Sequence, residues 1–229
     1  MKKLIIIPAY NESASIKQTV QTIKECASEF DYIIINDCST DDTLQICYDN
    51  HFPVIDLSLN LGIGGAVQTG YLYAYENDYE AAVQVDGDGQ HDPAFLNEMV
   101  KHLKEHGLDM VIGSRFIEMK GFQSSTIRRM GINYFSNVIK LLTGVLITDP
   151  TSGLRMVGKK VIKIFAESYP KDYPEPESVV SILRKGMKVE EIPVVMKARQ
   201  GGVSSISAGK SIYYMIKVTL AILIERIRG

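Results

Sequence analysis

The sequence lacks the features of several large protein classes. Its net charge is only −2 over 229 residues, so a general nucleic-acid binder, which needs a broad basic surface, is not expected. The first apolar run, at residues 4–7, is too short for the apolar region of a signal peptide. The three cysteines, Cys26, Cys38 and Cys47, form neither a CxxC pair nor a Cys/His metal spacing. We therefore expect thiols in a reducing, cytoplasmic protein.

Internal repeats, low-complexity segments and a clear linker are absent as well. Hydrophobic residues make up 45% of the chain and charged residues 23%, which is typical of a packed globular protein. We therefore expect one continuous domain over residues 1–229.

Short β-rich runs alternate with helical patterns in the first half. The pattern predicts strands at 4–8, 31–36, 54–57, 81–85 and 109–113, with helices at 16–27, 41–48, 63–75 and 93–106. Further along it predicts a helix at 127–142, a turn at 149–155 leading into a short strand, a helix at 179–184 and a strand at 187–195. This order predicts an α/β fold, Rossmann-like, with a mainly parallel central sheet and helices on both faces.

Polar residues gather where the predicted strands end. These residues are Asn11 and Glu12, Asn36 and Asp37, Asp86 and Asp88, and Ser114 and Arg115. Ligands of open parallel sheets bind beyond the carboxyl ends of the strands. The pattern therefore predicts a binding site along this edge.

The strongest single motif is the segment VDGDGQHDP at residues 85–93. Asp86 and Asp88 stand one residue apart at a strand end, and the intervening glycine relaxes the backbone. Such a pair suits a hard divalent cation, Mg²⁺ or Mn²⁺, that keeps positions open for diphosphate oxygens. The alternative is a glycine-rich turn with solvated acids. His91 follows directly, but we do not assign it as a metal ligand.

Three other segments carry weaker signals. Asn11 and Glu12 are placed to contact a base or ribose, although Asn11 or Ser13 would also suit a helix cap. Asp37 is placed to accept from a base or ribose. The glycines of residues 60–70 allow close approach to a ligand or to another element, but their spacing and position do not match a dinucleotide fingerprint.

Taken together, IPAYNE, the Asp37 segment, residues 60–70 and DGDGQ resemble, in order and spacing, the family 2 glycosyltransferases of the dolichol-phosphate mannose synthase-like branch. This resemblance implies a GT-A fold. It also implies inverting transfer of a sugar from a UDP- or GDP-linked donor to a polyprenyl phosphate at the cytoplasmic face of a membrane. Asn36 departs from the family's usual acid at that position, which leaves the donor base open.

The resemblance also assigns residues to roles. The nucleotide-sugar pocket would be lined by Pro8, Tyr10, Glu12, Asp37 and Asp86. The metal, Mg²⁺ or Mn²⁺, would be held by Asp86, Asp88 and Gln90. The acceptor phosphate would be bound by Arg115, Arg128, Arg155, Arg199 and Ser204, since guanidinium groups form bidentate, charge-assisted bonds to phosphate. The catalytic set would be Asp88, Arg115 and Arg199.

The same resemblance divides the chain by role. Residues 1–115 would bind the nucleotide-sugar, residues 116–207 the acceptor, and residues 208–229 would form a C-terminal amphipathic helix. The apolar stretch at 212–224 is too short to span a bilayer. It would lie in the membrane interface as a peripheral contact, or form the interface of a homo-oligomer.

The acceptor class decides whether a general base is needed. A phosphate monoester is mostly dianionic at neutral pH and attacks without one. A hydroxyl acceptor on a glycan or protein needs a base, for which Asp149, Glu175 and Glu177 are candidates. A non-catalytic nucleotide-sugar-binding module is the alternative outside enzymes, and intact Asp86 and Asp88 argue against it.

Overall fold

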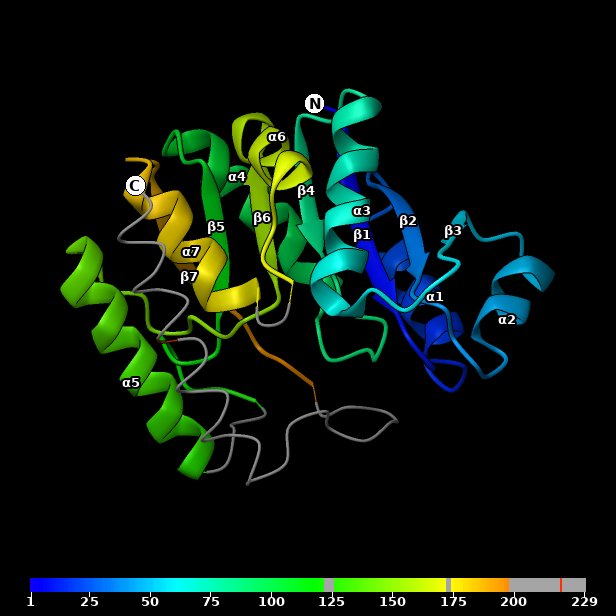
Figure 1. The fold of residues 1–229 in the computed structure, drawn as a ribbon, viewed down its shortest axis with the longest axis horizontal. Helices are drawn as coiled ribbons and strands as arrows, with labels where there is room; N and C mark the ends of the chain where they lie inside the picture. The colour runs from blue at the N-terminus through cyan, green and yellow to red at the C-terminus, as the bar shows by residue number, and fades with distance from the viewer. Residues whose placement is uncertain (122–125, 172–173, 198–218, 220–229) are drawn as a thin grey trace.

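The computed structural model describes residues 1–121, 126–171, 174–197 and 219 (Figure 1). Of residues 126–128 it describes the backbone alone. Arg199, Ser204 and the expected C-terminal helix, apart from Thr219, therefore lie outside the described residues, as does the side chain of Arg128. Within the described ranges, no helix combines the length and the apolar character that crossing a bilayer requires.

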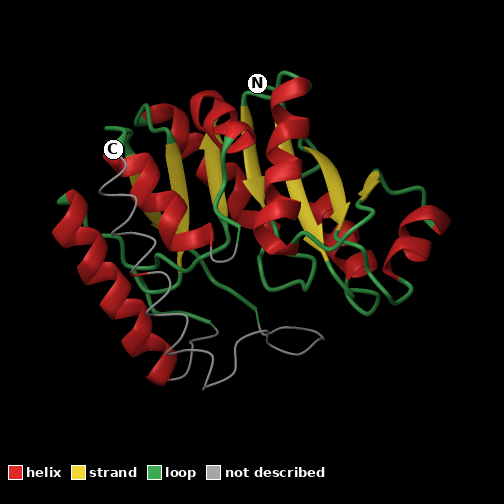
Figure 2. Cartoon of the chain, in the orientation of Figure 1, coloured by secondary structure: helices red, strands yellow, loops and turns green. Residues whose placement is uncertain are grey.

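Strands and helices alternate as the sequence predicts (Figure 2). The strands are β1 (Lys3–Ala9), β2 (Asp31–Asn36), β3 (Val54–Asp56), β4 (Ala81–Gln84), β5 (Met110–Ser114), β6 (Arg155–Gly158) and β7 (Val189–Pro193). The helices are α1 (Ile16–Cys26), α2 (Thr43–Asp49), α3 (Gly62–Glu76), the short 3₁₀ helix η1 (Pro93–Phe95), α4 (Leu96–Glu105), α5 (Thr126–Thr143), α6 (Lys159–Glu167) and α7 (Pro174–Arg184).

The strands form one sheet of seven in the order β3-β2-β1-β4-β6-β5-β7. Strand β6 is antiparallel to its neighbours β4 and β5, whereas the other pairs are parallel. The prediction of a mainly parallel sheet is therefore confirmed. The carboxyl ends of β1, β2, β4 and β5 reach the same edge, and because β6 runs the other way, the loop that precedes it reaches that edge too.

A separate apolar core covers each face of the sheet. In β1, Leu4 and Ile6 belong to one core and Ile5 and Ile7 to the other, because successive side chains of a strand point to opposite faces. Helices α3, α5, α6 and α7 cover the first face, and α1, α2 and α4 the second (Figure 1). Burial on both faces explains the uninterrupted apolar run of β1.

Two glycines of α3 serve helix packing. A Cβ at Gly70 would lie 2.2 Å from Ile6 Cγ2, so its absence lets the helix approach β1. A Cβ at Gly64 would lie 2.2 Å from the carbonyl oxygen of Pro170. The glycines of residues 60–70 were expected to allow close approach either to a ligand or to another element. At Gly64 and Gly70 the structure shows close approach to another element.

Two helices differ from the sequence prediction. Helix α6 was not predicted; its buried side chains, Val161, Ile162 and Phe165, occupy a single short stripe between lysines. Helix α7 begins at Pro174 rather than at residue 179, because proline is tolerated in a first helical turn, where no intrahelical N–H bond is lost.

Candidate active site

The loops that follow β1 and β2 are bound to each other at the carboxyl edge. Asn11 has a left-handed backbone (φ 57°), and its Oδ1 accepts from the backbone N of Thr40 at 2.8 Å. The backbone N of Glu12 donates to Thr43 Oγ1 at 2.8 Å. The Asn11 carboxamide thus joins two loops and does not cap α1, which corrects the helix-cap alternative for that residue.

Asp37 fixes the start of α3 from the end of β2. Its carboxylate Oδ1 accepts from the backbone N of Leu61 at 2.6 Å, and its carbonyl oxygen accepts from Asn60 Nδ2 at 3.0 Å. Asp37 is buried. Asp37, which was expected to contact the nucleotide, therefore holds the beginning of the glycine-rich segment at residues 60–70 in place.

The acidic loop after β4 packs against the end of β1. Thr19 Oγ1 of α1 donates to the carbonyl oxygen of Gly87 at 3.0 Å. A Cβ at Gly87 would lie 3.3 Å from the Pro8 carbonyl oxygen and 3.4 Å from Glu12 Cγ. The glycine between the two aspartates is therefore needed for the close approach of the DGDG and IPAYNE segments, which the structure brings together.

The two aspartates of this loop have different surroundings. Asp86 is partly exposed, and its Oδ1 accepts from Gln84 Nε2 at 2.8 Å. Asp88 is only 2% exposed, and its Oδ1 accepts from the backbone N of Gln90 at 3.0 Å. The alternative of a turn with solvated acids does not fit Asp88.

His91 lies against Asp86 and contacts its backbone. Its Nδ1 accepts from the backbone N of Asp86 at 3.0 Å, which places the proton of a neutral ring on Nε2. That Nε2 lies 3.7 Å from Asp86 Oδ2. His91 is buried, so it fixes the backbone of Asp86 and lies beside its carboxylate. His91 follows Asp86 by five residues in the sequence, but this spacing was not interpreted as a contact between the two side chains.

The loop before β6 reaches Asp86 as well. A Cβ at Gly153 would lie 3.3 Å from Asp86 Oδ2 and 3.2 Å from His91 Cε1. The antiparallel direction of β6 is the reason, because its first residues emerge at the carboxyl edge of β4. A segment from the second half of the chain therefore lies directly beside Asp86, one of the candidate metal ligands.

A buried ion pair follows β5 at this edge. Arg115 Nε donates to Asp149 Oδ2, and its NH2 donates to Asp149 Oδ1, both at 2.7 Å. The same NH2 donates to Thr151 Oγ1 at 3.1 Å. Arg115 is 7% exposed and Asp149 is fully buried. The bidentate geometry holds the guanidinium at one orientation.

Glu191 of β7 holds this pair from the opposite side. Its two carboxylate oxygens accept from the backbone N of Thr148, at 2.6 Å, and of Asp149, at 2.8 Å. Burial raises the pKa of the Glu191 carboxyl, the two backbone donors lower it, and the nearby charge of Asp149 raises it further, so that the pKa lies above its usual value. Sequence analysis missed Glu191, because a single glutamate in a strand gives no motif.

The order of these polar loops along one edge agrees with a family comparison. The model of the family described as Glycosyl transferase family 2 matches residues 4–165. The chain belongs to glycosyl transferase family 2. The matched range includes β1 to β6 and both members of the Arg115–Asp149 pair, so the geometry described above lies almost entirely within the family domain.

Named relatives of this family 2 glycosyltransferase include enzymes that use lipid phosphates. It is 30% identical to the UDP-N-acetylglucosamine–dolichyl-phosphate N-acetylglucosaminyltransferase of Methanococcus voltae, over 83% of each chain. It is 26% identical to the undecaprenyl-phosphate mannosyltransferase of Micrococcus luteus, over 91% of this chain and 89% of the relative. The resemblance stated from the motifs is thus confirmed.

Solved structures show the same fold. Glucosyl-3-phosphoglycerate synthase from Mycobacterium tuberculosis, in complex with phosphoglyceric acid, matches with a TM-score of 0.73 at 17% identity, covering 98% of this chain and 79% of the synthase. The same synthase in complex with Mn²⁺, UDP and glucosyl-3-phosphoglycerate matches with a TM-score of 0.70 at 18% identity, again covering 98% and 79%. The GT-A fold expected from the sequence is confirmed.

Arg155 was expected to bind the acceptor phosphate, and its surroundings do not support this expectation. The Arg155 side chain is 1% exposed. Its guanidinium donates to the carbonyl oxygens of Pro150, Ser152 and Glu175 and to Ser178 Oγ. These four acceptors lie in the loop before β6 and in α7, so Arg155 ties two segments together and is not placed to bind a phosphate.

The other expected site residues fall into two groups. At the β1 end, Pro8 is buried, whereas Tyr10 is half-exposed at 49% and remains a candidate for base contact. The side chain of Arg128, and all of Arg199 and Ser204, lie outside the described residues. Their roles stay predictions.

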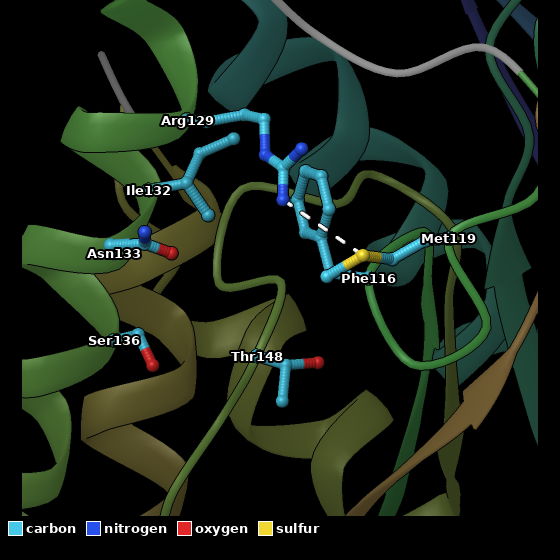
Figure 3. A pocket seen from close by; sticks show the side chains of 7 residues that line it. All are labelled: Phe116, Met119, Arg129, Ile132, Asn133, Ser136 and Thr148. Carbon is cyan, nitrogen blue, oxygen red and sulfur yellow. Dashed lines mark hydrogen bonds between the residues drawn. The ribbon is translucent and has the colours of Figure 1, made fainter. Parts of the chain in front are cut away.

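A pocket opens beside the Arg115 loop, between the start of α5 and the loops that follow β5 and precede β6 (Figure 3). Its volume is about 200 Å³, and it is lined by Phe116, Met119, Arg129, Ile132, Asn133, Ser136 and Thr148. The Arg129 guanidinium lies 5.7 Å from the centre of the Phe116 ring. Cationic and apolar groups therefore share one cavity. Arg129 lies within the helix predicted at residues 127–142, but it was not among the expected site residues.

Proposed function

We propose that the chain transfers a sugar from a UDP- or GDP-linked donor to a polyprenyl phosphate, with inversion, at the inner face of the membrane. The observation that carries the proposal is the meeting of three segments at the acidic loop. The IPAYNE segment packs closely against Gly87, between the two aspartates, and the loop before β6 packs closely against the Asp86 carboxylate at Gly153. The names of the Methanococcus and Micrococcus relatives support the lipid phosphate as acceptor.

The donor atoms at this edge suit a hard cation. Asp86 and Asp88 offer carboxylate oxygens, and Gln90, which is partly exposed, offers an amide oxygen. Mg²⁺ and Mn²⁺ prefer such oxygen ligands. Bound there, the ion would neutralise the diphosphate of the leaving nucleotide. The Mn²⁺ and UDP found with the related synthase structures support this assignment.

A phosphate acceptor agrees with the state of Asp149. A hydroxyl acceptor needs a base that is free to take a proton. The Asp149 carboxylate is fully buried and bound to Arg115 through both oxygens. Both oxygens are thus already engaged, and we assign Asp149 to orienting Arg115. A dianionic phosphate needs no such base.

The pocket beside α5 is suited to an amphiphilic acceptor. Arg129 contributes a cation, whereas Phe116, Met119 and Ile132 contribute apolar surface. A polyprenyl phosphate has the same two parts, a charged head and an apolar chain. Exposed apolar side chains continue along α5, with Met130 at 67% and Leu141 at 85% exposure. These side chains support peripheral contact of this half with a membrane.

The predicted catalytic arginine, Arg199, follows a residue that is anchored at the acidic loop. The backbone N of Lys197 donates to the carbonyl oxygen of Gln90 at 3.0 Å, and Lys197 Nζ lies 3.2 Å from Asp92 Oδ2. An extended chain covers at most about 3.6 Å per residue. Arg199 lies only two residues after Lys197, and this short length of chain is compatible with the proposal that Arg199 binds phosphate near the metal ligands.

The decisive experiment separates acceptor classes. The purified chain is incubated with Mn²⁺ or Mg²⁺, a nucleotide-sugar labelled in the sugar, and either polyprenyl phosphate or a panel of saccharides. We expect label in an acid-labile lipid product. Label reaching only saccharides would reject the lipid acceptor, and nucleotide-sugar binding without any transfer would favour a non-catalytic binding module. Thermal shifts with UDP against GDP, each with Mn²⁺, identify the donor base.

The metal assignment is tested at Asp88. We expect Asp88→Asn to reduce transfer at least 100-fold and to weaken Mn²⁺ binding, since an amide replaces a charged ligand. The matched control is Asp78→Asn, because the Asp78 side chain is 86% exposed and its one described ion pair is with Lys159 on the surface. Unchanged transfer by Asp88→Asn would show that this carboxylate does not hold the metal.

A further inference from the structure

Two histidines and a glutamate meet on the face of the sheet that α4 covers. His102 and His106 stand four residues apart at the end of α4, so their side chains lie on the same side of the helix. His102 Nε2 lies 2.8 Å and His106 Nδ1 3.2 Å from the same oxygen, Glu190 Oε2. Glu190 belongs to β7, so the cluster joins a helix to a strand that lies 84 or more residues away in sequence.

The spacing of these three groups matches that of ligands around one metal ion. One ligand atom from each residue lies within 4.8 Å of the others. Ligands about 2.1 Å from a Zn²⁺ ion stand about 3.0–3.4 Å from one another in octahedral or tetrahedral arrangements. Of the two nitrogen–oxygen separations, 3.2 Å lies within this range and 2.8 Å is about 0.2 Å below it. Small side-chain rotations at a partly exposed site suffice to admit the ion.

The cluster is separate from the candidate active site. Strands β5 and β7 are parallel, with Val111 beside Glu190 and Ser114 beside Pro193. Ser114 ends β5 at the carboxyl edge, and Glu190 stands three residues back along β7. At about 3.3 Å per residue this is a displacement of about 10 Å along the strands. Nothing in the proposed transfer reaction uses these histidines.

We infer that His102, His106 and Glu190 form a second metal site that binds Zn²⁺ or a similar divalent transition-metal ion, with water completing the coordination. Two imidazole nitrogens favour Zn²⁺, Ni²⁺ or Cu²⁺ over Mg²⁺, which prefers oxygen ligands. The site therefore differs in chemistry from the carboxylates at Asp86 and Asp88. Its location predicts a structural role, because the ion would bind an edge strand to a helix.

Clamping β7 has a consequence for the rest of the molecule. Among the residues that the structure describes, strand β7 lies at the end of the sheet and pairs only with β5. The next residue, Glu191, points to the opposite face and holds the backbone of Thr148 and Asp149. An ion at Glu190 would therefore hold the strand from one face while Glu191, on the other face, holds the loop before β6 that carries Asp149, the partner of Arg115.

Thermal unfolding with controlled metals tests the inference. Protein stripped with a chelator is first saturated with millimolar Mg²⁺, which occupies the oxygen-ligand site, and is then titrated with ZnCl₂. We expect the melting temperature to rise by about 5–10 °C at 100-fold excess over the dissociation constant, given the usual response of a protein of this size. A melting temperature that does not respond to Zn²⁺ in the Mg²⁺ background would overturn the inference.

Single substitutions locate the ion. We expect His102→Gln, His106→Gln and Glu190→Gln each to weaken Zn²⁺ binding at least tenfold by calorimetry. The matched control, His51→Gln, changes an exposed histidine outside the cluster and should keep the full response. Melting without metal shows whether each variant is folded. An anomalous scattering peak among the three side chains at the zinc edge would agree with the inference, and a Zn²⁺ response kept by all three variants would contradict it.

Discussion

Replacing Asp149 by asparagine should destabilise the protein strongly. The substitution keeps the shape of the side chain but removes the charge that faces a buried guanidinium. Both oxygens of Asp149 accept from Arg115 at 2.7 Å, and an asparagine can offer only one of them. Removing one partner of a buried ion pair costs about 3–5 kcal/mol. That is a large part of the 5–15 kcal/mol that typically stabilises a folded domain.

Urea denaturation followed by circular dichroism measures this loss. With a slope of about 2–3 kcal/mol per molar urea, the midpoint should fall by about 1–2 M. Asp78→Asn is the control, since its surface ion pair with Lys159 at 3.4 Å is worth less than about 1 kcal/mol. The double variant Arg115→Met/Asp149→Leu should recover much of the loss, because an apolar pair leaves no unpaired charge.

Two outcomes would refute the reasoning about this pair. A midpoint shift for Asp149→Asn no larger than that of Asp78→Asn would mean that the pair is not desolvated as the structure indicates. Single substitutions at Arg115 and Asp149 whose effects simply add in the double variant would mean that the two side chains do not interact.

Three further predictions concern other buried groups. Burial raises the pKa of Glu191 in the folded state, so the contribution of this group to stability should decrease as pH rises from about 4.5 through the raised pKa. Urea midpoints measured against pH should show this decrease in the wild type and not in Glu191→Gln. Identical pH profiles for the two proteins would reject the prediction. Gly153→Ala should lower transfer about tenfold or more, because its methyl group would lie only 3.3 Å from Asp86 Oδ2. Its melting temperature should change by only a few degrees. Full activity of this variant would show that the position of this loop does not matter for the reaction. Burial raises the pKa of the Cys47 thiol to about 11, so at pH 8 an alkylating reagent followed by mass spectrometry should label the exposed Cys26 and leave Cys47 unmodified until urea unfolds the chain.

The first half of the fold was predictable because its signals are local. Strands such as β1 are short apolar runs, and the alternation with helices fixes a mainly parallel sheet with its carboxyl ends at one edge. This was enough to bring Asp37, Asp86 and Asp88 to the same edge. The glycine between the two acids was expected only to relax the backbone, and its close approach to the end of β1 appears only in three dimensions.

The second half was harder because its contacts are long-range. Arg155 and Arg115 look alike in sequence, each a basic residue beside a loop, yet one donates to backbone carbonyls and the other pairs with an aspartate. Only burial and hydrogen bonding distinguish them. The cluster of His102, His106 and Glu190 was missed for the same reason. The histidine spacing is visible in the sequence, but the glutamate arrives from a distant strand.

Strand β6 has a consequence for how this site is divided. Because β6 runs between β4 and β5, the acidic loop and the Arg115 loop emerge two strand spacings apart, about 10 Å. The loop before β6, the 148–154 connection, lies between them and contacts both, because Gly153 lies beside Asp86 of the acidic loop and Asp149 pairs with Arg115. A substitution in this connection should therefore be felt on both sides of the candidate site, which ties the evolution of one side to that of the other.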